Sequence, residues 1–340
     1  MLLAWAGMSE MSALVVEGGS ARLKRDVPGP APVAGEARVA VLCAGVCATD
    51  LALVRGYMGF TGVPGHEFVG LALEGPLEGR RVVGEINAGC GRCERCATGD
   101  SRHCPRRTVL GILGRDGAFA QQLRLPLANL LPVPDVVSDE QAVFAEPLAA
   151  ALRITEQIEC AGRRVLVAGD GRLGLLCAHV LALAGAQVTV AGHHPGRAAL
   201  LPSGVRHVNQ LLDGDGPKPG ARTGERAAEP PEERWPLAVE ATGNPAVLPR
   251  LLRHVEPRGT VVLKTTSERH SELDLAPLVV DEQTLLGSRC GRLAPALELL
   301  ASGRIPVEEF VAARYPLERA SEALEQTARH GTLKVLIDLT

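Results

Sequence analysis

The feature that most restricts the fold of this chain is a glycine loop in its second half. A strand-like apolar run, RRVLVAG, leads into the loop GDGRLG, which is followed by the apolar segment LLCAHVLALAG and a second strand-like run, AQVTVAG. Strand, glycine loop, helix and strand in this order predict a βαβ unit. In such a unit Gly169 permits a tight turn, Gly171 lets the backbone approach a pyrophosphate, and Gly174 lets the helix pack on the strand. The pattern predicts an α/β domain with a doubly wound parallel sheet, the Rossmann fold, that binds a dinucleotide.

The end of the second strand indicates which dinucleotide is bound. An acid at this position usually accepts a hydrogen bond from the adenosine ribose 2′-hydroxyl. Here the position is Gly192, and His193, His194 and Arg197 follow it. Because there is no carboxylate at 192 to repel a 2′-phosphate, and because basic side chains can pair with one, these four residues favour NADP. NAD is not excluded, since the basic residues can also be solvated loop residues.

Four of the nine cysteines lie in one short stretch, CGRCERCATGDSRHC. Two-residue gaps allow successive thiolates to turn towards one tetrahedral zinc ion. Disulfides are the alternative, but neighbours this close would form strained loops, and the chain lacks the basic start of a secretion signal. Four cysteine ligands leave no open coordination position, so this zinc is expected to be structural. The predicted ligands are Cys90, Cys93, Cys96 and Cys104.

A second set of metal-ligand types is scattered through the first half of the chain. Cys47 follows an apolar strand-like run, His66 and Glu67 lie in VPGHEFVG, and Glu146 lies in VFAEPLAAAL at the start of a predicted helix. Scattered ligands are typical of catalytic zinc sites that several strand ends assemble. Each residue alone also fits an ordinary role: a buried thiol, a hydrogen-bonded histidine or a helix-start acid.

Size and charge exclude several classes of function. The chain has 340 residues, which is enough for two domains with their own cores. Its 36 basic and 39 acidic residues give a net charge of −3 without a long basic run, so we expect no nucleic-acid partner. No apolar run reaches the length that spans a bilayer. We therefore expect a cytoplasmic protein with a small-molecule substrate and no membrane association.

In combination, these motifs resemble the zinc-containing medium-chain alcohol dehydrogenase family, in particular the branch with sorbitol and threonine dehydrogenases. The resemblance runs from about Met11 onward, and GVCATD, PGHE, the four-cysteine stretch, GDGRLG, VEATGNPAVL and LLGSRCG occur in the order of the family. It implies a partly β, GroES-like catalytic domain at 11–146, a Rossmann domain at 147–290 and a C-terminal return to the catalytic domain at 291–340. The Pro- and Gly-rich segment 213–236 is expected to be a flexible loop.

The resemblance also implies roles for single residues. Cys47, His66 and Glu146 would bind the catalytic zinc, Glu67 would be an alternating or neighbouring ligand, and Asp50 would orient His66. Glu146 stands where classical members of the family have a second cysteine, as in the polyol and threonine branch.

The implied reaction is hydride transfer between a small alcohol or polyol and NAD(P), with zinc polarising the substrate oxygen. Thr49 would take the proton. The histidine that commonly ends the proton relay is replaced by Ala52. The alternative is an inactive nucleotide-binding regulator with the same fold; a zinc-ribbon interaction protein and a zinc-free quinone reductase fit the ligand sets less well.

Substrate identity and assembly are the least restricted by the sequence. Tyr57, Met58 and Phe60 are candidates for lining the substrate pocket, and Arg289, if it faces the pocket, would favour an anionic substrate. By analogy with the family we expect a homo-oligomer, a dimer or a tetramer.

Overall fold

The computed structural model describes residues 8–212, 232–267 and 270–340. Within these ranges the chain forms two compact units. The first contains the residues up to Ala149 together with Arg292–Thr340, and the second contains Ala150–Gly291. Most of the segment 213–236 lies outside the described residues. Among the described helices, none has the length and apolar character needed to cross a membrane.

The first unit is mainly β structure, and α5 continues from it into the second unit. In chain order its elements are β1 (Glu10–Glu17), β2 (Ser20–Pro28), β3 (Glu36–Val46), α2 (Ala48–Val54), η1 (Tyr57–Gly59), β4 (Glu67–Ala72), β5 (Arg81–Gly84), β6 (Asn87–Ala88), α3 (Glu94–Ala97), η2 (Ser101–His103), β7 (Thr108–Val109), β8 (Gln122–Pro126), η3 (Leu127–Asn129), β9 (Leu130–Pro132), α4 (Asp139–Val143), α5 (Ala145–Gln157), α9 (Leu293–Ala301), η6 (Val307–Phe310), β16 (Val311–Pro316), η7 (Leu317–Arg319), α10 (Ala320–Ala328) and β17 (Lys334–Asp338).

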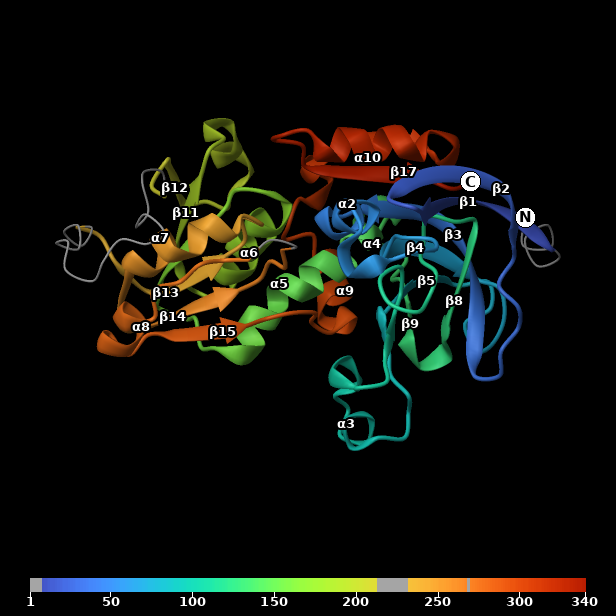
Figure 1. Ribbon diagram of the computed structural model, residues 1–340, viewed down its shortest axis with the longest axis horizontal. Helices are drawn as coiled ribbons and strands as arrows, with labels where there is room; N and C mark the ends of the chain where they lie inside the picture. The colour runs from blue at the N-terminus through green and yellow to red at the C-terminus, as the bar shows by residue number, and fades with distance from the viewer. Residues whose placement is uncertain (1–7, 213–231, 268–269) are drawn as a thin grey trace. The chain divides into compact units, whose positions relative to one another are not determined.

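A seven-stranded sheet organises this unit. Its order is β16-β17-β3-β4-β5-β9, and β8 pairs with β3 off this path. β3 occupies the middle because its sequence, EARVAVLCAGV, is apolar and buried along most of its length. β17 pairs antiparallel with β3, with Val335 opposite Val46, so the end of the chain completes the sheet. The loop around α3 projects away from the strands of its own unit (Figure 1).

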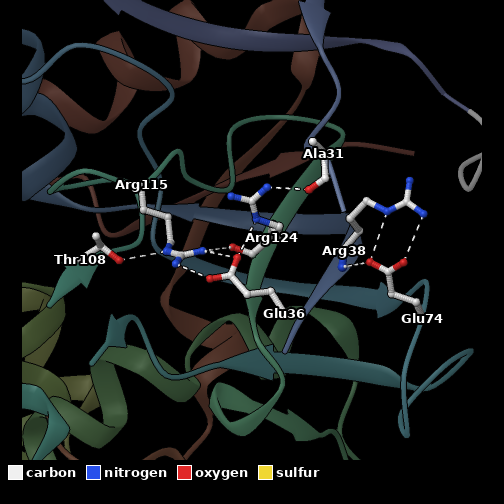
Figure 2. A network of polar contacts seen from close by, with 7 residues as sticks. All are labelled: Ala31, Glu36, Arg38, Glu74, Thr108, Arg115 and Arg124. Carbon is white, nitrogen blue, oxygen red and sulfur yellow. Dashed lines mark hydrogen bonds and ion pairs between the residues drawn. The ribbon is translucent and has the colours of Figure 1, made fainter. Parts of the chain in front are cut away.

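A network of arginines and glutamates ties the ends of strands in the first unit together (Figure 2). Glu36 accepts hydrogen bonds from Arg115 Nη2 at 2.7 Å and from Arg124 Nε at 2.6 Å. Hydrogen bonds from Arg115, together with the charges of both guanidinium groups, hold the pKa of Glu36 below its ordinary value against the opposing effect of burial. Close by, Arg38 binds Glu74 through its backbone N–H at 2.9 Å and through Nε at 3.3 Å.

The second unit is built on a wholly parallel six-stranded sheet, as predicted from the βαβ pattern. Its elements are β10 (Arg164–Ala168), α6 (Arg172–Leu183), β11 (Gln187–Gly192), η4 (Pro195–Leu200), β12 (Arg206–Asn209), β13 (Trp235–Glu240), η5 (Pro245–Val247), α7 (Leu248–Arg253), β14 (Val255–Leu263), α8 (Ala276–Val280) and β15 (Thr284–Gly287).

The strand order of this sheet is β12-β11-β10-β13-β14-β15. The direction of winding reverses between β10 and β13, and ligands of doubly wound sheets bind at the carboxyl ends of strands beside such a reversal. Figure 1 shows the sheet with α6, which packs on β10 and β11, and α7, which packs on β13 and β14. Trp235, Val255 and Leu251 of α7 are fully buried in the core cluster that this helix forms with the sheet. The predicted combination of a Rossmann unit with a partly β unit is confirmed.

Candidate functional site

The pairing of β3 with β4 brings Cys47 and His66 together. In this antiparallel pair Gly45 lies opposite Glu67, so the end of β3 is next to the start of β4. Cys47 follows β3 directly and His66 precedes β4 directly. Ligand atoms of Cys47, His66 and Glu67 all lie within 4.8 Å of one another. A thiolate, an imidazole and a carboxylate at this separation are a donor set that suits zinc.

Asp50 supports this cluster from the first turn of α2. Its Oδ2 accepts the Cys47 backbone N–H at 2.8 Å, which caps the helix, and its Oδ1 accepts the Gly65 N–H at 3.2 Å. The distance from Oδ1 to His66 Nδ1 is 3.3 Å, an ion-pair contact. Burial disfavours the imidazolium, but the charge of Asp50 and its hydrogen bond outweigh burial and raise the pKa of His66. A carboxylate against one ring nitrogen makes the other a better metal ligand.

Lys334 is a member of this site that the sequence did not indicate. It begins β17, is 2% exposed, and forms an ion pair with Glu67, while its Nζ lies 5.7 Å from the centroid of the Phe144 ring. A Cβ at Gly45 would lie 2.5 Å from Glu67 Oε2 and 3.3 Å from Lys334 Cδ. The two side chains therefore meet across β3 only because residue 45 has no side chain. A single lysine in the apolar strand KVLID was the available signal.

Thr49 and Glu146 are the remaining predicted residues of this site. Thr49, half-buried in α2, has its Oγ1 3.8 Å from Cys47 Sγ. Glu146 lies in the first turn of α5 and does not belong to the cluster within 4.8 Å that the described residues form. That helix begins at Ala145, two residues before the proline at which the sequence pattern starts it. Glu146 therefore stays a predicted ligand.

The residues considered for substrate contact come from two parts of the chain. Tyr57 and Met58 lie in η1, and Phe60 follows it. Met58 is 56% exposed and has a left-handed backbone, with φ of 59°. The Arg289 side chain is exposed, and its carbonyl accepts a hydrogen bond from Lys264 Nζ at 2.9 Å. Ala52 lies in α2, where the proton relay of the family commonly has histidine.

The four-cysteine loop folds into a second cluster. The Sγ atoms of Cys90, Cys93, Cys96 and Cys104 lie within 4.8 Å of one another, and all four thiols are free. Cys93 Sγ is 3.5 Å from Cys96 Sγ and 3.6 Å from Cys104 Sγ. A disulfide needs about 2.05 Å, whereas a tetrahedron with zinc–sulfur bonds of about 2.3 Å has edges of roughly 3.8 Å. The spacing fits a tetrathiolate zinc site and not a disulfide pair.

Arg106 adds positive charge beside these thiols. Its Nη2 donates to Cys90 Sγ at 3.3 Å, and its backbone N–H donates to Cys104 Sγ at 3.4 Å. The Arg92 backbone and the Arg106 side chain lower the pKa of Cys90 to about 5. The thiolate form of Cys90, which is the form that binds metal, is therefore favoured. At Cys93 a backbone hydrogen bond is outweighed by burial and by hydrogen bonds from the neighbouring thiols, which raise the pKa of Cys93 to about 11.

The glycines of the loop between β10 and α6 differ in their surroundings. Gly169 has a φ of +107°, and a Cβ there would lie 2.8 Å from the Ala241 carbonyl oxygen. A Cβ at Gly174 would lie 1.9 Å from the Gly169 carbonyl oxygen, so helix and loop touch directly. A Cβ at Gly171, the residue that caps α6, would meet nothing within 4 Å. The helix N-terminus is therefore not blocked at Gly171.

At the end of β11 the surroundings differ from those expected. Gly192 is the last residue of the strand and is buried against the carboxylate of Asp170, a loop residue that the sequence pattern left without a role. His193 is exposed, but His194 and Arg197 contact Asp170. A short side chain between two glycines of the loop was the only signal for Asp170.

Two family models match the chain. One, described as "Alcohol dehydrogenase GroES-like domain", matches residues 33–135, and the other, described as "Zinc-binding dehydrogenase", matches residues 173–302. An L-threonine 3-dehydrogenase of Streptomyces avermitilis is 29% identical over 97% of this chain and 100% of its own length. An L-galactonate-5-dehydrogenase of Escherichia coli is 27% identical over 94% of this chain and 96% of its own.

Three solved structures share the fold. The alcohol dehydrogenase TADH from Thermus sp. ATN1 is 30% identical, with a TM-score of 0.79, and covers 97% of this chain and 100% of its own. A zinc-binding dehydrogenase from Sinorhizobium meliloti, bound to NADP, is 26% identical with a TM-score of 0.82. An alcohol dehydrogenase from E. coli CFT073, complexed with NADH, has the same identity and TM-score. Both cover 98% of this chain and 100% of their own.

Proposed function

We propose, from the premise that this chain belongs to the zinc-containing medium-chain alcohol dehydrogenase family, that its substrate is a small polyol or similar hydroxylated compound. The chain is a zinc-type oxidoreductase that acts on alcohols. The observation that carries the proposal is the set formed by the half-buried Cys47 and the buried His66 and Glu67, with the Thr49 hydroxyl beside Cys47. Relatives named for threonine, galactonate and arabinitol support a substrate with several polar groups.

The donor set fits zinc, and Cys47 and His66, with Glu67 or Glu146, would hold it. When bound, zinc supplies Lewis acidity that lowers the pKa of a substrate hydroxyl. Asp50 fixes the orientation of His66, and the Lys334 ammonium fixes Glu67. Thr49 would accept the hydroxyl proton at Oγ1 and pass it on. Because Ala52 cannot continue that relay, the proton would leave through water.

The nicotinamide dinucleotide, when bound, accepts or donates the hydride. Gly169, Gly171 and Gly174 would hold its pyrophosphate at the start of α6. One related structure contains NADP and another NADH, so relatedness alone does not set the preference of this chain. The functional domains would be 11–146 with 291–340 for catalysis and 147–290 for the cofactor.

Zinc content and turnover, measured together, test this proposal. We expect two zinc ions per wild-type chain and one in Cys47→Ser, which should lose cofactor reduction over a panel of polyols and alcohols. Cys160→Ser is the matched control, because Cys160 belongs to neither cluster and its Sγ donates to the Ile158 carbonyl oxygen at 3.2 Å. One zinc ion in both wild type and Cys47→Ser, without turnover, would instead favour the inactive nucleotide-binding regulator.

A homo-oligomer and a cytoplasmic location complete the proposal. β15 is an edge strand of the parallel sheet, and the neighbouring Leu275, Val279 and Val280 are exposed apolar residues. An edge strand beside an apolar surface supports association with a second copy. Light scattering with chromatography tests the dimer or tetramer, and cell fractionation tests the location.

A further inference from the structure

A buried carboxylate occupies the end of β11, although no acid stands there in the sequence. A Cβ on Gly192 would lie 2.1 Å from Asp170 Cγ and 2.2 Å from its Oδ2. Asp170 comes from the loop after β10, which lies beside β11 because the two strands pair in parallel. The place of the missing acid is therefore taken by a carboxylate from the neighbouring loop. No side chain larger than hydrogen fits at 192 while the Asp170 side chain keeps this position.

Four donors hold this carboxylate. Oδ2 accepts the His194 backbone N–H at 2.8 Å and contacts His207 Nε2 at 3.3 Å. Oδ1 contacts His194 Nδ1 at 3.0 Å and Arg197 Nη1 at 3.4 Å. An ionised carboxylate can only accept hydrogen bonds, so His194 Nδ1 and His207 Nε2 both act as donors here. Asp170 is 3% exposed. Burial raises the pKa of Asp170, but the bonds from His194 and His207 and the charge of Arg197 lower it by more.

The same contacts engage the basic residues that suggested a 2′-phosphate site. Arg197 is 8% exposed and turns its guanidinium inward, where Nη1 also donates to the Asp170 carbonyl oxygen. A 2′-phosphate is best recognised by an arginine fork that faces the ligand. Here Asp170 neutralises the charge of that fork and turns it away from the ligand, so little attraction for a 2′-phosphate is left.

We propose that Asp170 is the specificity-determining residue for the cofactor and that it makes the protein prefer NAD(H) to NADP(H). The inference rests on the proposed function, because it assumes that the adenosine ribose lies at the end of β11. It reverses the preference that the basic residues alone suggest. In this arrangement Asp170 supplies the negative charge that an acid at the end of the second strand normally supplies. His194 and Arg197 then serve to hold Asp170.

Binding of reduced cofactors without substrate tests the inference, because the fluorescence of the dihydronicotinamide reports the dissociation constant (Kd) directly. We expect the wild-type holoenzyme to bind NADH at least about tenfold more tightly than NADPH. Gaining or losing a hydrogen bond or an ion pair with a charged group typically changes the Kd by about this factor. Asp170→Asn keeps the shape and releases Arg197 and His194 from a negative charge. It should strengthen NADPH binding and change the ratio of the two Kd values by about tenfold or more.

Glu256→Gln is the matched control. It removes one negative charge from the same unit, where Glu256 pairs with Arg164 at 2.6 Å on the exposed end of β14, and should leave the ratio unchanged.

A second pair of probes, AMP with and without a 2′-phosphate, isolates the adenosine half of the site in case Asp170→Asn alters the loop. Thermal unfolding without ligand checks that the variant is folded.

Three outcomes would overturn the inference. They are a wild-type preference for NADPH, an unchanged ratio in Asp170→Asn, and a variant that loses NADPH more than NADH, which would mean that Asp170 holds Arg197 and His194 for a phosphate. Each of these still involves dinucleotide binding and leaves the proposed function intact. Failure of the wild type to bind either cofactor would overturn the proposed function as well.

Discussion

Lys334 and Glu67 form a buried ion pair although 267 positions separate them in the chain. The pair joins the last strand of the chain to the residue after His66, and Gly45 makes room for it. Removing one partner of a buried pair leaves an uncompensated charge, which typically costs about 3–5 kcal/mol. The pair therefore links closure of the sheet by β17 to the shape of the candidate metal site.

Replacing Lys334 should reveal this link. We expect Lys334→Met to lower the free energy of unfolding by about 3 kcal/mol, measured by urea unfolding with zinc present. The double variant Lys334→Met with Glu67→Gln should be more stable than the sum of the single losses, because it leaves no charge unpaired. Additive losses would show that the two side chains do not interact energetically.

Acidification should weaken the first unit through Glu36. Its pKa is held below the ordinary 4.5, so its contribution to stability is present above that pH and is lost as the pH falls through the lowered value. Glu36→Gln should cost about 1 kcal/mol at neutral pH and should flatten the loss of stability below pH 4.5. Urea midpoints between neutral pH and strong acid measure both effects. Glu78→Gln, in an exposed turn, should follow the wild-type curve.

The four-cysteine loop should lose its order without its metal. Cys96→Ser leaves three thiolates, so we expect one zinc ion fewer per chain and rapid tryptic cleavage at the exposed Arg92 and Arg95. Cys47→Ser should lose one zinc ion too, but its loop should stay resistant to trypsin. Mass spectrometry of the fragments distinguishes the two sites. Equal resistance of Cys96→Ser and wild type would argue against a structural metal here.

The loop before α6 allows packing and ligand access to be separated. Gly174→Ala would force a methyl group against the Gly169 carbonyl oxygen, and overpacking of this kind costs about 1–3 kcal/mol. Gly171→Ala meets no neighbouring atom, so it should fold normally and yet bind dinucleotide about tenfold or more weakly. Thermal unfolding and a cofactor titration on both variants check this. If Gly171→Ala binds the dinucleotide with wild-type affinity, the pyrophosphate does not bind at this position.

What the sequence could predict depended on how local each feature is. The βαβ unit and the four cysteines lie in continuous stretches, where spacing alone determines which atoms can meet. Cys47 and His66 needed the pairing of β3 with β4, which their family resemblance supplied. No motif indicated Lys334, because its partner Glu67 lies on β4, and β3 stands between β4 and β17.

Asp170 illustrates a different limit. The acid was sought at the end of β11, where Gly192 stands, but side-chain positions in space need not follow strand positions in sequence. A glycine at a place that usually carries a side chain indicates that something else fills the space. From the sequence alone, His194 and Arg197 were basic residues; only their contacts with Asp170 show where they point.

Thr49 should be needed for proton transfer but not for cofactor binding. Its hydroxyl is the group beside Cys47 that can accept and pass on a proton. Thr49→Val preserves the shape and removes the hydroxyl, so we expect kcat to fall by about a hundredfold or more. Thr49→Ser keeps the hydroxyl and should retain most of the activity. Cofactor affinity and zinc content should be unchanged in both variants. If Thr49→Val keeps full kcat at every pH, the proton leaves the substrate by another route, and water at this site would have to accept it directly.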